Sequence, residues 1–329
     1  MNKFKAFRIH STAGKISSGF ENIEIDDLSA GDVLIKAVYS SINYKDALAA
    51  TGKGRILKSY PLVGGIDVSG YVEESADKRF NKGDKVLICG AGLSETRDGG
   101  YAEFVRVPAN IVIPLPTQLS LFESMAIGTA GFTAAMAVHQ LQHNGQTPDM
   151  GPTVVTGATG GVGSFAIDLL SALGFEVIAI SGKKQKADYL KSLGASKILF
   201  RDQLDMGNKP LEPGLWGGAV DTVGGQMLSW LTRTVNPLGN IATIGLTGGI
   251  NLETTVMPFI LRGINLLGIN SVYCPDELKS LIWNRLASDL KPRHIKEIVT
   301  DEIVLDQLAE KFEAYLQGNV CGRVVVKIQ

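Results

Sequence analysis

The sequence predicts an α/β protein in which a β-rich domain precedes a doubly wound parallel sheet that binds a nucleotide. Short β-type runs separated by glycine turns fill the first third of the chain. Strand-like and helix-like segments alternate through most of the remainder, and a glycine-dense turn joins the first of those strands to its helix. Alternation of this kind is typical of a parallel sheet with helices on both faces.

The β-rich domain is predicted from runs of β-branched and aromatic residues with Gly-Asp, Gly-Gly and Lys-Gly-Asp turns between them. Their spacing favours an irregular barrel or sandwich over strand–helix alternation. Pro114 and Pro116 end this region, because proline cannot continue a central strand. The expected strands cover residues 4–9, 33–41, 68–74, 85–89 and 101–107.

A helical region is expected next, because Ser120 and Glu123 have the spacing of a capping box. Its apolar pattern continues past Gly128 and Gly131 to about Leu141. We place a domain boundary in this region, near residue 125.

Beyond that boundary the alternating pattern predicts the doubly wound sheet. The terminal strand 323–328 could pair back with the first domain, which would make that domain discontinuous. We therefore expect one domain of residues 1–125 and 273–329 and a nucleotide-binding domain of residues 126–272. The expected strands are 176–181, 197–200, 218–222, 240–245 and 264–272, and the expected helices are 184–193, 226–235, 276–290 and 304–317.

The glycine-dense turn lies in residues 154–163, where an apolar run leads into Ala158-x-Gly160-x-x-Gly163 and then into a helical pattern. Glycines let backbone approach a pyrophosphate, and the helix N-terminus offers free N–H donors. A plain structural strand–helix turn is the alternative. The context of strand, turn and helix favours a dinucleotide site.

The next strand indicates which dinucleotide binds. NAD-preferring sheets carry an acidic residue about 20 residues past the glycines. Here the strand ends in Ser181-Gly182-Lys183-Lys184 with Lys186 close behind, and Arg201 ends the following strand. Cations and a hydroxyl suit the 2′-phosphate of NADPH. The alternative is a solvated, lysine-rich helix start.

Composition narrows the classes of function. A net charge of −1 argues against nucleic acid or an anionic membrane as the main partner. The first residues lack a signal-like apolar core, and no uninterrupted apolar run has the length of a membrane span, so a cytoplasmic protein is expected. Cys89, Cys274 and Cys321 are far apart and predict neither disulfides nor a metal site.

Longer phrases carry a resemblance to a known family. They are Ser-Ile-Asn-Tyr-Lys-Asp-Ala-Leu from Ser41, Thr-Gly-Lys-Gly from Thr51, Gly-Thr-Ala-Gly-Phe-Thr-Ala from Gly128, Asp-Thr-Val-Gly from Asp221, and Thr-Thr-Val-Met-Pro-Phe-Ile-Leu-Arg from Thr254. Over essentially its whole length the chain resembles the medium-chain dehydrogenase/reductase superfamily. It is most similar to the zinc-free, quinone-oxidoreductase-like members, in particular the NADPH-dependent acryloyl-CoA reductase branch. The resemblance implies a GroES-like catalytic domain and a Rossmann domain that binds NADPH.

Zinc is not expected, because the motifs that supply its ligands in related alcohol dehydrogenases are changed. Their Cys-His-x-Asp motif falls on Asn43-Tyr44-Lys45-Asp46, so Asn43 replaces the cysteine ligand. Their Gly-His-Glu motif falls on Gly65-Ile66-Asp67, so Ile66 replaces the histidine ligand. Alcohol oxidation is therefore not expected, since no Lewis acid would lower the alcohol's pKa.

The resemblance implies hydride transfer from NADPH to the β-carbon of acryloyl-CoA, giving propionyl-CoA. Tyr44, Asn43 and Asp46 are the expected catalytic residues, with Tyr44 beside nicotinamide and substrate. Tyr44 could instead be a core aromatic, and water could donate the proton. Lys45 and Asp46 could form a structural ion pair, and Asp67 could be structural.

The resemblance also implies the cofactor contacts. Pyrophosphate is expected at the glycine turn, the 2′-phosphate at the end of the next strand, and the nicotinamide near later segments. Arg323 is expected to reach the cofactor, and a surface arginine is its alternative. The expected contacts are Tyr44, Thr159, Gly160, Gly161, Val162, Ser181, Gly182, Lys183, Arg201, Leu246, Ile260, Ser271 and Arg323.

Two other functions stay open at this point: an NADPH:quinone or enone reductase, and a non-catalytic NADPH-binding redox sensor. A coenzyme A ester would favour basic residues near the substrate, for which Lys53, Arg55 and Lys58 are candidates, although a solvated loop also explains them. The resemblance implies a homodimer, with the edge strand 264–272 as the expected pairing surface.

Overall fold

The computed structural model describes residues 3–329, and the chain divides into two compact units. The first unit comprises Met1–Thr129 with Val299–Gln329, and the second comprises Ala130–Ile298. The second unit runs further than the expected end at residue 272, because the following segment packs on it. The Trp283 ring stacks on Phe132 at 5.9 Å, and His294 Nδ1 lies 2.8 Å from Asp168 Oδ1.

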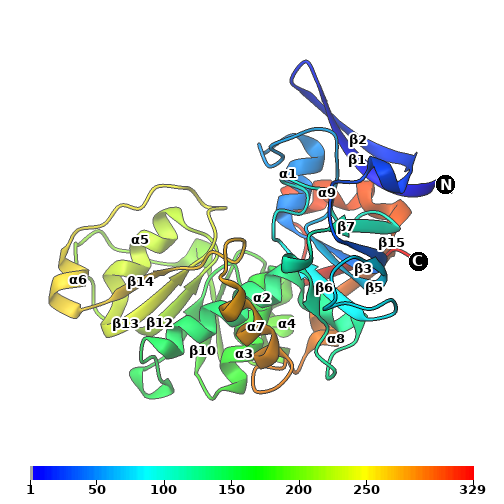
Figure 1. Cartoon of the computed structure of the whole chain (residues 1–329). Coiled ribbons are helices and arrows are strands. Elements are labelled where there is room, and N and C mark those ends of the chain that lie inside the picture. The colour runs from blue at the N-terminus through cyan, green and yellow to red at the C-terminus, as the bar shows by residue number, and fades with distance from the viewer. Residues whose placement is uncertain (1–2) are drawn as a thin grey trace. The chain divides into compact units, whose positions relative to one another are not determined.

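The first unit is a β structure built from two sheets. A three-stranded sheet has the order β2-β1-β4, and a larger sheet has the order β15-β16-β3-β5-β6-β8 with β7 paired to β3. Figure 1 labels most of these strands. The strands are β1 Phe4–Thr12, β2 Lys15–Ile23, β3 Val33–Ile42, β4 Leu62–Val63, β5 Asp67–Ser75, β6 Lys85–Cys89, β7 Phe104–Val107, β8 Ile113–Pro114, β15 Val299–Val304 and β16 Arg323–Lys327, and the helices are α1 Tyr44–Thr51 and α9 Leu308–Leu316.

The expected return of the C-terminal strand is confirmed. β16 pairs antiparallel with β3, placing Val324 opposite Ile42, and it pairs parallel with β15. Its valines are buried because they enter the apolar core that also contains residues of β1 and α9. Arg323 therefore begins a strand inside the larger sheet.

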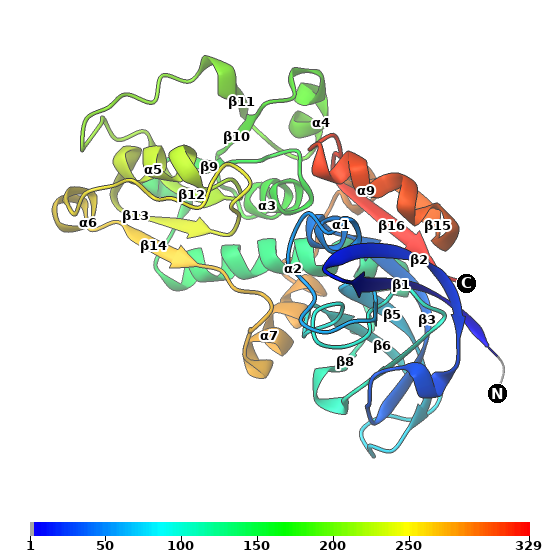
Figure 2. The ribbon, with the colours of Figure 1, turned by 90° about the horizontal axis from the view of Figure 1, so that it is seen from above.

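The second unit contains the doubly wound sheet that the alternating pattern predicts. Its six parallel strands have the order β11-β10-β9-β12-β13-β14 (Figure 2). The strand order reverses between β9 and β12, which is where such sheets bind ligands at their carboxyl ends. The strands are β9 Thr153–Val155, β10 Val177–Ser181, β11 Lys197–Phe200, β12 Trp216–Asp221, β13 Val235–Thr243 and β14 Asn265–Gly268, and the helices are α3 Gly161–Ala172, α4 Ala187–Ser192, α5 Gly225–Thr234, α6 Met257–Arg262, α7 Asp276–Leu286 and α8 Ile295–Ile298.

Helix α2, Leu121–His143, begins at the expected capping box, where the Ser120 and Glu123 side chains bond each other's backbone N–H. It is kinked at Gly128, which has φ +49° and ψ −159°. By length and composition α2 could cross a membrane, yet 83% of the relevant window is buried. Such burial is also found in the core helices of globular proteins.

Candidate active site

The glycine turn of the second unit links the end of β9 to the start of α3. Gly160 is the N-cap of α3, and Gly161 and Val162 form its first residues. Thr159 is 6% exposed just before them. Because the first backbone N–H groups of a helix have no intrahelical acceptor, this turn presents donors suited to pyrophosphate.

Two glycines in the turn are required by close backbone packing. At Gly163 a Cβ would lie 2.5 Å from the Gly157 carbonyl oxygen and 2.8 Å from the Cα of Ala158. Gly157 has φ +57°, and a Cβ there would lie 2.1 Å from Thr222 Oγ1. The motif Ala158-x-Gly160-x-x-Gly163 does not include Gly157, although Gly157 adopts the left-handed conformation at this turn.

A buried acid fixes the turn from the neighbouring strand. Asp221, at the end of β12, accepts hydrogen bonds from Thr156 Oγ1 at 2.5 Å and from the Gly224 backbone N–H at 2.8 Å. Burial raises the pKa of Asp221, although these bonds oppose that rise. The sequence alone indicated no role for Asp221, although the Asp-Thr-Val-Gly phrase that begins with it contributed to the family resemblance.

The residues expected at the 2′-phosphate come together at the ends of β10 and β11. The Lys183 backbone N–H donates to Ser181 Oγ at 3.0 Å. A Cβ on Gly182 would lie 3.5 Å from Arg201 Nη2, which places that guanidinium beside the turn. Lys184 differs, because it forms an ion pair with Asp202 at 2.8 Å. Ser181, Gly182 and Arg201 therefore form one basic corner.

The three residues expected near the nicotinamide do not lie at the same edge of the sheet. Leu246 follows the carboxyl end of β13, and Ser271 follows that of β14, where its Oγ accepts from Thr133 Oγ1 at 2.9 Å. Ile260 lies on α6, which precedes β14 and is anchored by Arg262 to the carbonyl of Val235, the first residue of β13. Ile260 is thus at the amino edge, away from the phosphate turn, and this chain does not bring it together with Leu246 and Ser271.

The first unit holds a buried polar cluster around Asp67, which is fully buried on β5. Its carboxylate accepts from Ser41 Oγ at 2.7 Å and Asn43 Nδ2 at 2.8 Å, and Arg323 Nη2 lies 3.6 Å away. Arg323 is 2% exposed and donates to Ser41 Oγ at 2.6 Å and to Asn43 Oδ1 at 2.9 Å. Arg323 is therefore not a surface arginine, and in the first unit it binds Asp67 and its neighbours.

Helix α2 contributes to this cluster through its kink. A Cβ on Gly128 would lie 2.5 Å from Arg323 Nη2 and 2.6 Å from Asp67 Oδ2. The break in the helix lets the Thr129 backbone N–H and hydroxyl donate to Asp67 at 3.0 and 2.5 Å. The sequence showed Gly128 inside a helical pattern but not the cluster that requires it.

Asp46 is buried beside Asp67 and closes the capping box of α1. It accepts from the Asn43 backbone N–H at 2.8 Å and from the Ile66 backbone N–H at 3.0 Å. Burial, and then the negative charge of Asp67, raise the pKa of Asp46 to about 7. Near neutral pH this carboxyl can therefore hold a proton. It does not pair with Lys45, which pairs with Glu95 instead.

Tyr44 begins α1, directly after Asn43. Its side chain is 41% exposed, so it is not a core aromatic. Asn43, by contrast, is 9% exposed and uses both ends of its amide inside the cluster, towards Arg323 and Asp67. Tyr44 is therefore an exposed residue at the start of a helix whose N-cap, Asn43, belongs to the buried cluster.

The cluster does not fit a zinc ion. Asn43 and Ile66 stand where the resemblance places zinc ligands, and the Ile66 side chain has no lone pair. Both carboxylates are already bonded, Asp46 to backbone N–H groups and Asp67 to Ser41, Asn43 and Thr129. Across residues 3–329 no group of three or more His, Cys, Asp or Glu side chains is arranged to hold a metal.

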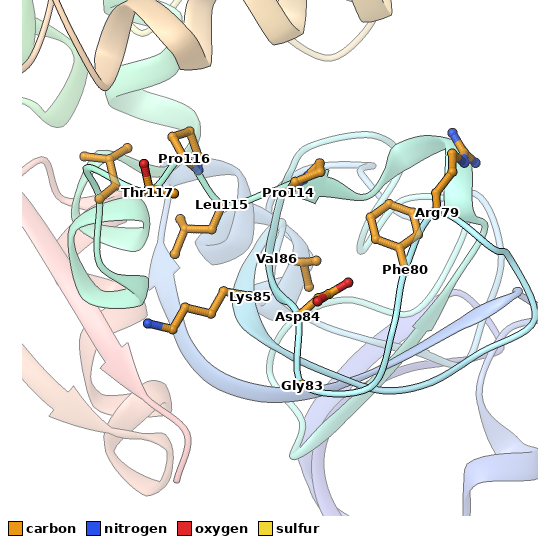
Figure 3. Close-up of a pocket in the computed structure, with 11 residues that line it drawn as sticks. Arg79, Phe80, Gly83, Asp84, Lys85, Val86, Pro114, Leu115, Pro116 and Thr117 are labelled. Atoms are coloured by element: carbon orange, nitrogen blue, oxygen red, sulfur yellow. The ribbon is translucent and has the colours of Figure 1, made fainter.

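A separate surface groove of about 520 Å³ lies on the first unit. Figure 3 shows the cations Arg79 and Lys85 on opposite sides of it, with Phe80 and Pro114 near Arg79. Arg79 is already paired with Asp77 at 2.9 Å. None of the residues that line the groove is an expected site residue, so we assign no chemistry to it.

Comparison with known proteins matches the two parts of the chain to two protein families. Residues 29–117 match the family "Alcohol dehydrogenase GroES-like domain", and residues 161–288 match the family "Zinc-binding dehydrogenase". The chain is 45% identical to "Putative quinone oxidoreductase YhfP" of Bacillus subtilis, covering 99% of both chains. It is 43% identical to "Probable acrylyl-CoA reductase AcuI" of Escherichia coli, covering 98% of this chain and 99% of the relative.

Two solved structures match the fold over essentially the whole chain. The yhdH oxidoreductase from Salmonella enterica, in complex with NADP, superposes with a TM-score of 0.95 at 44% identity, covering 99% of this chain and 100% of that one. Bacillus subtilis yhfP with NAD bound gives a TM-score of 0.97 at 45% identity over 100% of both chains. The expected GroES-like and Rossmann architecture is confirmed. The chain is an oxidoreductase that belongs to the medium-chain dehydrogenase/reductase superfamily.

Proposed function

We propose that this chain uses NADPH to reduce the activated C=C bond of acryloyl-CoA, giving propionyl-CoA without a metal ion. The observation that carries the proposal is the buried cluster of Asn43, Asp46, Asp67 and Arg323. The resemblance places a zinc ligand of related alcohol dehydrogenases at Asn43, which here hydrogen-bonds Asp67 and Arg323 instead. The relative of Escherichia coli with 43% identity carries the name of acrylyl-CoA reductase, which supports the substrate class.

The second unit would hold NADPH through the residues described above. Thr159, Gly160, Gly161 and Val162 would bind the pyrophosphate at the start of α3. Ser181, Lys183 and Arg201 would bind the 2′-phosphate, with lysine giving a point charge and arginine a planar fork. Binding of NADP by the Salmonella structure supports this preference, and the NAD in the Bacillus structure makes it worth measuring.

Bound NADPH supplies a hydride to the β-carbon of the enoyl thioester, and a proton must then reach the α-carbon to complete the reduction. We assign the proton to the Tyr44 hydroxyl, because Tyr44 is the exposed member of the expected catalytic set. Asn43 and Arg323 hold the start of α1 in place behind it. Because the pKa of Asp46 is raised to about 7, this carboxyl is partly protonated near neutral pH, which limits the negative charge of the buried cluster.

Replacing Tyr44 by Phe tests this assignment. The variant should lower kcat for acryloyl-CoA about 10²-fold, the lower end of general acid catalysis, and leave the NADPH dissociation constant unchanged. An unchanged kcat would assign the proton to water.

The substrate is tested by comparing kcat/KM for acryloyl-CoA, crotonyl-CoA and a simple benzoquinone. We expect acryloyl-CoA to give the highest value. A quinone reductase is the second candidate, favoured by the name of the Bacillus relative. A clear preference for benzoquinone would establish that candidate and reject the thioester.

The same family resemblance supports a homodimer through the open edge of the Rossmann sheet. β14 is the edge strand, and large apolar side chains near its amino end are exposed: Leu238 by 69%, Ile260 by 72% and Leu261 by 62%. Pairing with a second copy would cover both the edge and this apolar surface. Sedimentation of the wild type and of Ile260→Asp tests it: a dimer that the substitution splits is expected, and a monomeric wild type contradicts it.

A further inference from the structure

The loop that follows β6, residues 90–97, contains buried polar atoms that have no partner. Among the described residues, Arg97 Nε, Arg97 Nη1 and Ser94 Oγ are buried and make no hydrogen bond. Arg97 as a whole is only half-buried, although these two nitrogens are themselves buried. Leaving a buried charged donor unpaired is costly. The guanidinium therefore needs an acceptor that the chain itself does not provide.

The carboxylates next to Arg97 in the sequence are used elsewhere. Glu95 forms an ion pair with Lys45. Asp98 is 3% exposed, and its two oxygens accept the backbone N–H groups of Ser29 and Val63, each at 2.7 Å. Neither carboxylate forms an ion pair with Arg97, because each is bonded to other groups.

The backbone of this loop is held in an unfavourable conformation. Ala91 and Ser94 have φ of +51° and +57°, a region that favours glycine. The loop is nevertheless fixed, because the Lys58 backbone N–H donates to the Glu95 carbonyl at 2.7 Å and the Ser94 N–H donates to the Arg97 carbonyl at 2.8 Å. Strain of this kind is common at ligand-binding segments.

The loop also adjoins the buried cluster. β6 ends at Cys89, and burial, followed by the charge of Asp67, raises the pKa of its thiol. Lys45, the partner of Glu95, follows Tyr44 directly. The segment of Lys58, an exposed lysine, is bonded to the same loop. The pair of Lys45 with Glu95 therefore links this loop to the residue that follows Tyr44.

We propose that Arg97 binds a phosphate group of the coenzyme A portion of the substrate. Phosphate oxygens offer several acceptors that match a guanidinium fork. A quinone, which is neutral, would leave the Arg97 charge unbalanced. This inference rests on the proposed function, since it names the part of the thioester that the chain recognises. It makes Arg97 a specificity residue and not a participant in hydride or proton transfer.

Calorimetric titration tests the proposal directly, with coenzyme A and phosphate-free pantetheine as the two probes. Saturating NADP⁺ is present throughout, so that coenzyme A cannot occupy the cofactor site through its own adenosine. Arg97→Ala should raise the dissociation constant of coenzyme A at least tenfold and leave that of pantetheine unchanged. Arg97→Lys should recover part of the loss. Arg79→Ala is the matched control, because Arg79 is an exposed arginine of the same unit, and it should behave as the wild type.

A thermal unfolding measurement separates this role from a structural one. Arg97→Met removes an unpaired buried charge, so the ligand-free variant should unfold at the same temperature as the wild type or a higher one. A structural arginine would instead give a lower temperature. Equal coenzyme A binding by the wild type and Arg97→Ala overturns the proposal. So does an equal loss for pantetheine, or a wild type that binds no coenzyme A. If acryloyl-CoA is not reduced while coenzyme A binding still depends on Arg97, only the proposed function fails.

Discussion

The phosphate turn of the second unit and the polar cluster of the first are built in different ways. The turn is local: Gly157, Gly160 and Gly163 lie within one strand–helix connection and act through backbone geometry. The cluster is assembled from β3, α1, β5, α2 and β16, and its side chains act through charge and hydrogen bonds in a buried setting. Added side-chain volume should therefore disrupt the glycine turn, whereas loss of one charged partner should destabilise the buried cluster.

The largest expected effect comes from removing one partner of the buried cluster. Arg323→Met leaves the Asp67 carboxylate buried without its arginine, and we expect the free energy of unfolding to fall by about 3–5 kcal/mol. Chemical denaturation measures it. The exposed Arg79–Asp77 pair is the control, and Arg79→Met should change stability much less. Adding Asp67→Asn to Arg323→Met should restore part of the loss; an Arg323→Met variant as stable as the wild type would show that the cluster is not a charged network.

The next effect concerns pH and Asp46. Its pKa in the folded protein, about 7, lies above the ordinary value of 3.8, so the folded state holds this proton more tightly than the unfolded state. The contribution of Asp46 is fully present below about pH 4 and is lost as the pH rises towards 7, by roughly 4 kcal/mol in total.

Asp46→Asn, which does not titrate, should lose that part of the slope of stability against pH. Denaturation at a series of pH values measures the slopes, and comparing slopes avoids the cost of the lost acceptor itself. Equal slopes in both proteins would mean that Asp46 titrates normally.

A pair of glycine substitutions compares the two regions directly. In Gly163→Ala the new Cβ meets backbone of the phosphate turn, so NADPH affinity should fall about tenfold or more. In Gly128→Ala it meets Arg323 and Asp67, so kcat should fall while NADPH affinity stays close to that of the wild type. Fluorescence titration of NADPH and steady-state kinetics measure the two quantities. The same pattern of losses in both variants would contradict the separate roles.

The smallest effect is on cofactor choice. Lys183→Asp should weaken NADPH binding about tenfold and change NADH binding little, because only NADPH carries the 2′-phosphate. Lys186→Asp, in the same lysine-rich segment, should have a weaker effect. Equal losses for NADPH and NADH would place Lys183 away from that phosphate.

Most strands and helices of the second unit were predictable, because apolar runs and glycine stops alternate there at regular spacing, but the short helices α6 and α8 were not predicted. β2 was not predicted, since Lys15–Ile23 carries serines and a glycine and has little buried surface. The last strand of the sheet, β14, ends at Gly268 and not at residue 272 as expected. The residues that follow it form turns, in which the backbone N–H groups of Val272 and Tyr273 donate to Asn270 Oδ1. The local pattern of apolar residues thus predicts those strands and helices whose own side chains form the core.

The two halves of the candidate site differ in the same way. Ser181, Gly182 and Arg201 could be placed from the sequence, because the carboxyl ends of neighbouring parallel strands share an edge. The contact of Arg323 with Asp67 could not, because it depends on the pairing of β16 with β3. The separation of Ile260 from Leu246 and Ser271 could not be predicted either, because nothing in its phrase indicates that α6 precedes β14 at the opposite edge. Arg97 gave no signal, since an unpaired group is visible only when its surroundings are known.

The most direct test of the account is a single labelled turnover. Chelator-treated protein would be given acryloyl-CoA and NADPH that carries deuterium at the transferable position, and the propionyl-CoA would be analysed by mass spectrometry and NMR. The account predicts deuterium at the β-carbon, at a rate equal to that of untreated protein. Loss of activity on chelation, or product without deuterium at that carbon, would contradict metal-free reduction by this cluster.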